Sequence, residues 1–73
     1  MPRLPVVSAR KVIRALLRLG FAVIRQSGSH IHLWHDERRV LVTVPNHPEL
    51  ARGTLNSILK QGKLSREEFL EQL

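Results

Sequence analysis

The hydrophobic residues near the start of the chain recur at the spacing of an α-helix. Between Ser8 and about Leu19 they form one stripe, which consists of Ala9, Val12, Ile13, Leu16 and Leu17. Ser8 is a favourable N-cap, because its hydroxyl can accept a hydrogen bond from the first turn. Gly20 is the residue type that commonly follows the end of a helix. The pattern therefore predicts an amphipathic helix, preceded by an extended lead-in over residues 1–7 that holds two prolines.

The hydrophobic period then changes to that of β-strands. Three short segments rich in β-forming residues follow one another, over residues 21–26, 30–35 and 40–44. They are separated by the turn sequence Ser27-Gly28-Ser29 and by a charged break at residues 36–39. Connections this short predict an antiparallel meander. Pro45 ends the third strand, because proline has no N–H to donate to a ladder.

Helical patterns return after the strands. The first covers residues 54–61, ends at Gly62 and carries three apolar residues, which are Leu55, Ile58 and Leu59. Ser65 followed by Glu68 is a capping-box pattern, and it opens a short last helix with apolar residues on one side, namely Phe69, Leu70 and Leu73. We therefore expect one α+β domain over residues 1–73, with the order α-β-β-β-α and a short extra C-terminal helix.

Two or three short helices can cover only one face of a three-stranded sheet. Alternation along the second strand then directs Ile31 and Leu33 towards the helices. The same alternation directs His30, His32 and Trp34 to the uncovered face. On the third strand we expect Leu41 and Thr43 to point outward and the valines to point inward, at positions 40, 42 and 44. The first strand is ambiguous, because both of its faces carry apolar residues, and Phe21 and Phe69 are assigned to the core.

Length and composition exclude several classes of protein. A chain of 73 residues is too short for a dinucleotide-binding domain, a barrel or a two-domain enzyme. The chain has no cysteine, which excludes disulfides, zinc–thiolate sites and cysteine nucleophiles. No apolar run approaches the roughly 20 residues of a membrane span, and no N-terminal signal is visible. We therefore expect a cytoplasmic protein that does not associate with membranes.

The charge balance points to a polyanionic partner. Twelve Lys and Arg residues against six Asp and Glu residues give a net charge of +6. On the first helix the charges opposite the apolar stripe all have the same sign, and they are Arg10, Lys11, Arg14 and Arg18. This face is either simply solvated or faces phosphates, since unpaired basic stripes are typical of nucleic-acid-binding surfaces. A net charge of this size also occurs in small domains for solubility alone.

Candidate chemistry centres on Gly28-Ser29-His30 at the start of the second strand. Motifs of serine hydrolases, P-loop proteins, zinc proteases and dinucleotide-binding proteins are absent from the sequence. A histidine can take or give a proton near neutral pH. RNA suits so small a site, because its 2′-hydroxyl is the nucleophile and no metal is needed. The alternative is that His30 is an ordinary surface residue.

Other functions for the histidines and the tryptophan are less favoured. A zinc site would need three or four convergent ligands, and His35 alternates to the face opposite His30 and His32. We therefore expect no metal and no cofactor, and we assign His47 to a turn. Trp34 could stack on an unpaired base, but a role as an apolar filler in the core or at a partner interface is favoured.

Several segments in this order resemble the HicA family, which comprises small toxins of bacterial and archaeal toxin–antitoxin pairs. The resemblance runs from about residue 8 to the end and rests on a basic helix, Gly20-Phe21, and the segments at 25–30, 42–47 and 53–59, which read RQSGSH, VTVPNH and GTLNSIL. It implies a fold like that of double-stranded-RNA-binding domains. It also implies an mRNA interferase activity that stops translation, and neutralisation by a HicB antitoxin. The family's catalytic histidine corresponds to His30, with Gly28 and Ser29 as its supporting turn.

The leading hypothesis is a metal-independent endoribonuclease in which His30 is the general acid and base. The RNA would be held by basic residues, which are Arg10, Lys11, Arg14, Arg18 and Arg25. The main alternative is a non-catalytic RNA-binding module of the same fold. A third interpretation is a protein-interaction module with an acidic partner, and an antitoxin that covers the open sheet face and His30 is compatible with the first hypothesis.

Overall fold

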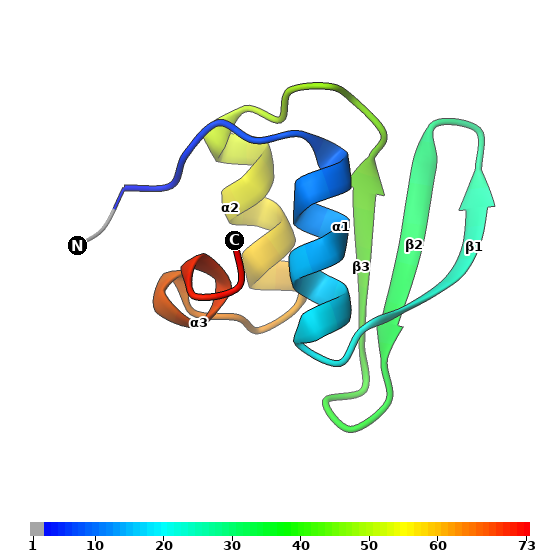
Figure 1. Ribbon diagram of the computed structural model, residues 1–73. Helices are drawn as coiled ribbons and strands as arrows, with labels where there is room; N and C mark the ends of the chain where they lie inside the picture. The colour runs from blue at the N-terminus through cyan, green and yellow to red at the C-terminus, as the bar shows by residue number, and fades with distance from the viewer. Residues whose placement is uncertain (1–2) are drawn as a thin grey trace.

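The predicted order of helices and strands is found in the computed structural model, which describes residues 3–73 (Figure 1). The elements are α1 (Ala9–Arg18), β1 (Ala22–Ser27), β2 (His30–His35), β3 (Val40–Pro45), α2 (Arg52–Gln61) and α3 (Arg66–Leu70). Helix α2 begins two residues earlier than expected, and Phe21 precedes β1 as a buried residue. Within the described residues, no helix is both long and apolar enough to cross a bilayer.

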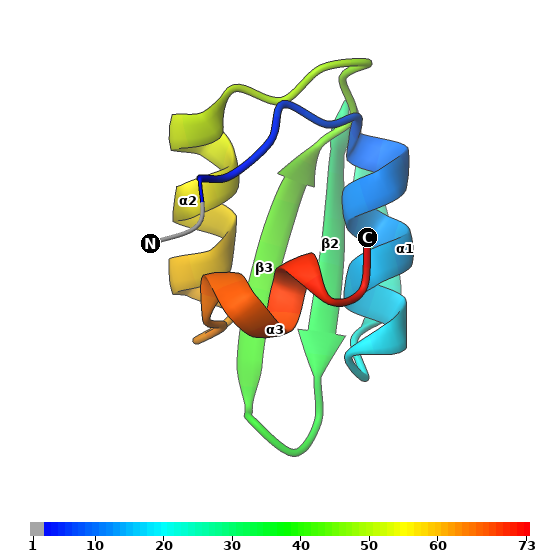
Figure 2. The same ribbon diagram turned by 60° about the vertical axis from the view of Figure 1, so that its left-hand side comes forward.

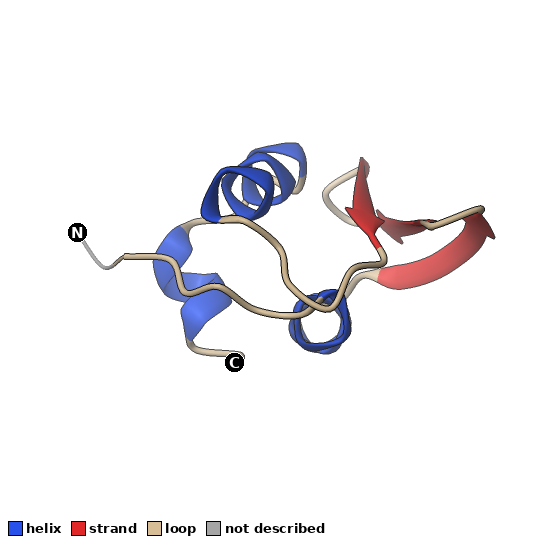
Figure 3. Ribbon diagram, turned by 90° about the horizontal axis from the view of Figure 1, so that it is seen from above, coloured by secondary structure: helices blue, strands red, loops and turns tan. Residues whose placement is uncertain are grey.

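The strands form an open antiparallel sheet with β2 in the centre, and the helices lie on one face of it (Figure 3). Helices α1 and α2 pack against β3, whereas all six residues of β1 are exposed. Strand β1 also contains an irregularity between Val23 and Arg25, where one extra residue interrupts the pairing with β2. The expected α-β-β-β-α arrangement is therefore confirmed, and its helices shield β2 and β3 better than β1.

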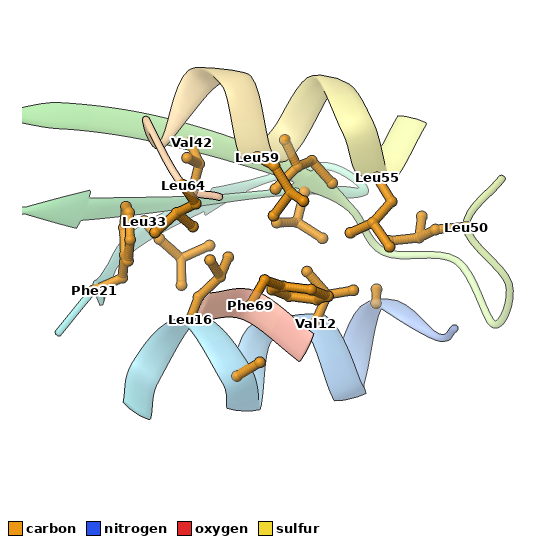
Figure 4. Close-up of a cluster of buried hydrophobic side chains, with 14 of the residues drawn as sticks. Val12, Leu16, Phe21, Leu33, Val42, Leu50, Leu55, Leu59, Leu64 and Phe69 are labelled. Atoms are coloured by element: carbon orange, nitrogen blue, oxygen red, sulfur yellow. The ribbon is translucent and has the colours of Figure 1, made fainter. Parts of the chain in front are cut away.

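Helix α3 completes the core from the side opposite the sheet. It lies between α1 and α2 (Figure 2) and inserts Phe69, whose side chain is fully buried. Figure 4 shows this ring among the apolar side chains of α1 and α2. The expected inward residues of the sheet are all buried, and they are Ile31, Leu33, Val40, Val42 and Val44.

Two residues that the sequence placed on the apolar sides of helices are exposed. Leu17 is 47% exposed, and Ala15 is fully buried instead. At 3.6 residues per turn, Ala15 lies about 60° from the buried Val12, whereas Leu17 lies about 140° from it. Leu73 was placed with Phe69 on one side of the last helix, but α3 ends at Leu70 and Leu73 is 48% exposed.

The last helix begins with the predicted capping box. The Ser65 hydroxyl accepts a hydrogen bond from the backbone N–H of Glu68, and the Ser65 N–H donates to the Glu68 carboxylate at 3.2 Å. This backbone hydrogen bond, together with Arg38 at 2.8 Å, lowers the pKa of Glu68 below its ordinary value of 4.5. Because Arg38 lies in the turn between β2 and β3, the carboxylate also ties α3 to the sheet.

One buried histidine joins the end of α1 to the β2–β3 turn. His35 is 8% exposed; its Nε2 lies 3.1 Å from the carbonyl oxygen of Leu19, and its Nδ1 lies 3.1 Å from the backbone nitrogen of Arg38. The carbonyl can only accept and the backbone N–H can only donate, so both contacts are satisfied by the tautomer with its proton on Nε2. The ring also meets Phe21 edge-on, with centroids 4.9 Å apart. His35 is therefore a structural residue that faces the core.

Replacing Gly20 with alanine is expected to destabilise the protein by roughly 2–4 kcal/mol, because two penalties combine. Gly20 has φ +98°, and an added Cβ would lie 2.9 Å from Nε2 of His35. The matched control is Gly53→Ala in α2, where a Cβ would meet no atom within 4 Å. This control should stabilise the helix by about 0.5–1 kcal/mol. Urea unfolding followed by circular dichroism measures both, and equal midpoints for the two variants would contradict the role of Gly20.

Candidate functional site

The predicted hairpin turn places His30 as the first residue of β2. Ser27 and His30 form the last pair between β1 and β2, so Gly28 and Ser29 are a two-residue connection. Of these two residues only Gly28 has positive φ, at +59°, as in hairpin turns that favour glycine at their first central position. A Cβ on Gly28 would meet nothing within 4 Å, so the space beside the turn is open. The Gln26 amide donates to the Gly28 carbonyl at 3.2 Å and braces the turn.

Three segments that are distant in the sequence meet at this end of the sheet (Figure 1). His30 pairs with Pro45 at the end of β3, and the backbone N–H of Asn46 donates to the Ser29 carbonyl at 2.6 Å. The next residue, His47, accepts a hydrogen bond through its carbonyl from the N–H of Ala9 at 3.0 Å. The turn that carries His30 is thus fixed to the 45–47 loop, and this loop is fixed to the first turn of α1.

The His30 side chain is available for contact with a ligand. It is exposed, and no residue between positions 3 and 73 forms a hydrogen bond with its imidazole. Alternation with the buried Ile31 turns the ring towards the face of the sheet that the helices leave uncovered. Both ring nitrogens can therefore reach a molecule bound there, as the sequence pattern predicted.

The strand register shows which residues share this uncovered surface. Residues directly opposite one another in neighbouring strands point to the same face. The surface, called the open face below, thus has three rows across β1, β2 and β3, which are Ser27–His30–Pro45, Arg25–His32–Thr43 and Ala22–Trp34–Leu41. His32 in the central row is held by Thr43, whose hydroxyl lies 3.1 Å from the imidazole Nδ1. Histidine and arginine side chains therefore occupy the end and the middle of the open face.

Arg25 is the predicted basic residue that lies closest to His30 on this face. It is exposed and sits diagonally across from His30, at a Cα separation of about 7–8 Å for such neighbours in a sheet. A side chain as long as that of arginine spans this separation. A molecule in contact with the His30 imidazole is therefore within reach of the Arg25 guanidinium.

The basic residues predicted on α1 are exposed, but they face a different direction from His30. Three of them line a groove of about 490 Å³ together with the lead-in and the C-terminus, and the lining residues are Pro5, Val6, Val7, Lys11, Arg14, Arg18, Gln72 and Leu73. Arg18 donates to the Gln72 carbonyl at 2.8 Å. Arg10 and Lys11 lie in the turn of α1 that is fixed to the 45–47 loop, whereas Arg18 is about 12 Å further along the helix. Arg10 and Lys11 are thus the basic residues of α1 at the end of the sheet where His30 lies.

The structure adds one basic residue that the sequence analysis did not single out. Arg39 ends the four-residue connection between β2 and β3, and its guanidinium carbon lies 5.3 Å from the centroid of the Trp34 ring. Its Nη1 also lies 3.2 Å from the carboxylate of Asp36. Arg39 adopts φ +57°, a backbone conformation that returns the chain towards the sheet. The sequence marked residues 36–39 only as a charged break, because the direction of this side chain depends on the turn conformation.

Trp34 is not part of the hydrophobic core. It is half-buried on the open face, opposite Ala22 on one side and Leu41 on the other. Its indole N–H lies 3.4 Å from the Asp36 carboxylate. The expectation that Trp34 fills the core is therefore wrong. The two other roles considered, contact with a partner and stacking on an unpaired base, are both roles at the surface.

The histidines do not converge. His30 and His32 share the open face, His35 is buried on the opposite face, and His47 lies in the loop after β3. In the part of the chain that the structure describes, no group of three or more His, Asp or Glu side chains could hold a metal ion. The donor set that zinc requires is thus not assembled within these residues.

Comparison with protein families gives one result that covers most of the chain. The family model described as the HicA toxin of bacterial toxin–antitoxin systems matches residues 9–64. The matched region begins with α1, contains the Gly28-Ser29-His30 turn and the 45–47 loop, and ends before α3. A comparison with curated proteins found no match.

Proposed function

The chain belongs to the HicA toxin family of bacterial toxin–antitoxin systems, and from this premise we propose that it is an endoribonuclease that uses His30 and no metal. The observation that carries the proposal is the exposed imidazole of His30, which has no hydrogen-bond partner between residues 3 and 73. It stands at an open turn with Arg25 diagonally across from it. A proton acceptor beside a cation is what cleavage of a phosphodiester by its own neighbouring hydroxyl requires.

One histidine is sufficient for both proton transfers of the reaction. The His30 imidazole removes the proton of a ribose 2′-hydroxyl, and the 2′-oxygen attacks the adjoining phosphorus. The bond between phosphorus and the 5′-oxygen of the next nucleotide breaks, and this oxygen takes the proton from the His30 imidazolium formed in the first step. The products are a 2′,3′-cyclic phosphate and a 5′-hydroxyl. The Arg25 guanidinium stabilises the negative charge that builds up on the phosphate oxygens in the transition state.

The basic residues of α1 extend the surface for RNA. Arg10 and Lys11 lie near the 45–47 loop. Lys11 also lines the groove, together with Arg14 and Arg18. We assign these side chains to phosphates of the part of the strand that leaves the open face towards α1, where they hold the strand without reading its bases. The substrate we propose is messenger RNA in the cytoplasm, so that cleavage stops translation. A HicB-like antitoxin would prevent cleavage by covering His30 and the open face.

Cleavage of labelled single-stranded RNA by the purified protein in the presence of a chelator tests the proposal. We expect fragments that end in a 2′,3′-cyclic phosphate or in its hydrolysis product, because the reaction needs only the 2′-hydroxyl and His30. A 2′-deoxy substitution at the cleaved nucleotide is the matched control, and it should block cleavage at that position. Intact RNA with a shifted band on a native gel would overturn the proposal and favour a non-catalytic RNA-binding module.

A further inference from the structure

The single tryptophan of the chain stands on the same strand and the same face as His30. Trp34 is half-buried and lies outside the core cluster, so packing of the interior does not account for it. Its cross-strand neighbour towards the free edge of the sheet is Ala22, which has the smallest side chain in the three rows of the open face. Ala22 therefore covers less of the Trp34 ring from this side than any other residue of the three rows would.

The spacing along β2 matches a strand of nucleic acid. Trp34 lies four positions after His30, which corresponds to about 13 Å along an extended strand. Arg25 and His32 occupy the row between them. An unstacked RNA strand spans this distance with about two nucleotides, and such strands offer splayed bases to aromatic side chains. A proton-transfer group, a cation and an aromatic ring therefore follow one another in the order that a single strand could contact.

The charges on this surface favour phosphates. Arg25 lies in its middle row, and the Arg39 guanidinium lies over the Trp34 ring, 5.3 Å from its centroid, in a cation–π contact. The Asp36 carboxylate, which lies 3.4 Å from the indole nitrogen, is also paired with Arg39 at 3.2 Å. An indole beside a guanidinium is a common arrangement for stacking a base while contacting its phosphate.

We propose that the open face binds single-stranded RNA along β2, with one base stacked on Trp34 about two nucleotides from the ribose that faces His30. A duplex does not fit this arrangement, because its bases are paired and stacked inside the helix and cannot reach the indole. The proposal deepens the function proposed above, since it identifies the conformation of the substrate. It rests on that function only for the role of the strand's other end, at His30.

Tryptophan fluorescence tests the stacking directly, because Trp34 is the only source of indole emission in the chain. The protein used is His30→Ala, which should bind RNA without cleaving it. Titration with a short single-stranded oligoribonucleotide is expected to quench the emission, whereas the same sequence annealed to its complement should leave it unchanged. In a series of oligonucleotides that each lack one base, only the one that lacks the base stacked on Trp34 should fail to quench the emission. Equal quenching by the duplex, or no quenching by the single strand, would overturn the proposal.

A pair of substitutions separates stacking from simple hydrophobic contact. Trp34→Phe keeps an aromatic ring, and Trp34→Leu keeps an apolar side chain without one. We expect the dissociation constant for labelled single-stranded RNA to rise about tenfold or more in Trp34→Leu and much less in Trp34→Phe. In the protein that retains His30, Trp34→Leu should raise KM for RNA cleavage and leave kcat nearly unchanged. Equal affinities of the two folded variants would contradict stacking.

A second pair of substitutions tests the cation that lies over the Trp34 ring. The Arg39 side chain is 71% exposed, so Arg39→Ala should fold normally and weaken binding of the single strand severalfold. Lys60→Ala removes the same charge from α2, on the other side of the sheet, and should have a smaller effect. If the unsubstituted protein shows quenching but no cleavage, the proposed nuclease activity is refuted and the proposed binding of RNA to the open face is retained. A Trp34 emission that responds to an acidic protein partner and not to RNA would instead assign the open face to protein binding.

Discussion

Replacing His30 with alanine is expected to lower the rate of RNA cleavage by about a hundredfold to ten-thousandfold, which is the usual contribution of a general acid–base group. The growth arrest caused by producing the protein should be lost with it. The fold should survive, because the imidazole is exposed and has no hydrogen bond to residues 3–73. Substitutions at such surface positions usually change the free energy of unfolding by less than about 0.5 kcal/mol.

The measurement is the single-turnover rate on labelled RNA, with urea unfolding of the same preparation to verify the fold. Added imidazole provides a matched control, since a free base can enter the space that alanine leaves and should restore part of the rate. Rescue of this kind separates lost proton transfer from lost binding. Undiminished cleavage by well-folded His30→Ala protein would refute the proposed role of His30 whatever the family resemblance.

Replacing Phe69 with alanine is expected to destabilise the protein by about 3–5 kcal/mol, the usual cost of emptying a buried aromatic site. Phe69 is fully buried, and α3 has only five residues to present it. Proteins of this length have a free energy of unfolding of roughly 4–11 kcal/mol, so this loss consumes a large share of it. We expect the midpoint of urea unfolding to fall sharply or the variant to be unfolded in buffer.

The control for Phe69→Ala is Leu73→Ala, three residues past the end of α3. Leu73 is 48% exposed, and its replacement should change the free energy of unfolding by less than about 0.5 kcal/mol. The comparison also bears on the family match, which ends at residue 64. If Phe69 is required, a chain cut after residue 64 should not fold. Equal midpoints for the two variants would mean that α3 contributes little to the core.

Predictions that depend on neighbouring residues agree well with the structure. Ser8 accepts a hydrogen bond from the N–H of Lys11 as an N-cap, and Ser65 and Glu68 form the capping box. The turn at Gly28 and the inward residues of β2 and β3 were also predicted correctly. These features follow from hydrogen bonds within one turn or from the alternation of a strand, so a short stretch of sequence contains the whole cause.

Predictions that depend on how elements pack against one another were less complete. Leu17 was placed in the apolar stripe of the first helix, but α1 turns Ala15 inward and leaves Leu17 exposed. His35 was recognised as facing away from His30, but its hydrogen bonds to residues at positions 19 and 38 could not be inferred. The helical period gives the width of an apolar stripe, and the orientation of the helix against the sheet decides which residues at its margin are buried.

The candidate site divides in the same way. The sequence alone identified His30, its glycine turn and the face that it shares with His32 and Trp34, because a strand's alternation and a glycine's backbone freedom are local properties. Only the tertiary structure decided that Arg25 shares this face, that α1 directs its basic groove elsewhere, and that Arg39 lies beside Trp34. Those relations arise from strand register, helix packing and one turn with positive φ. Each of them joins residues through space, and spacing along the chain does not determine such contacts.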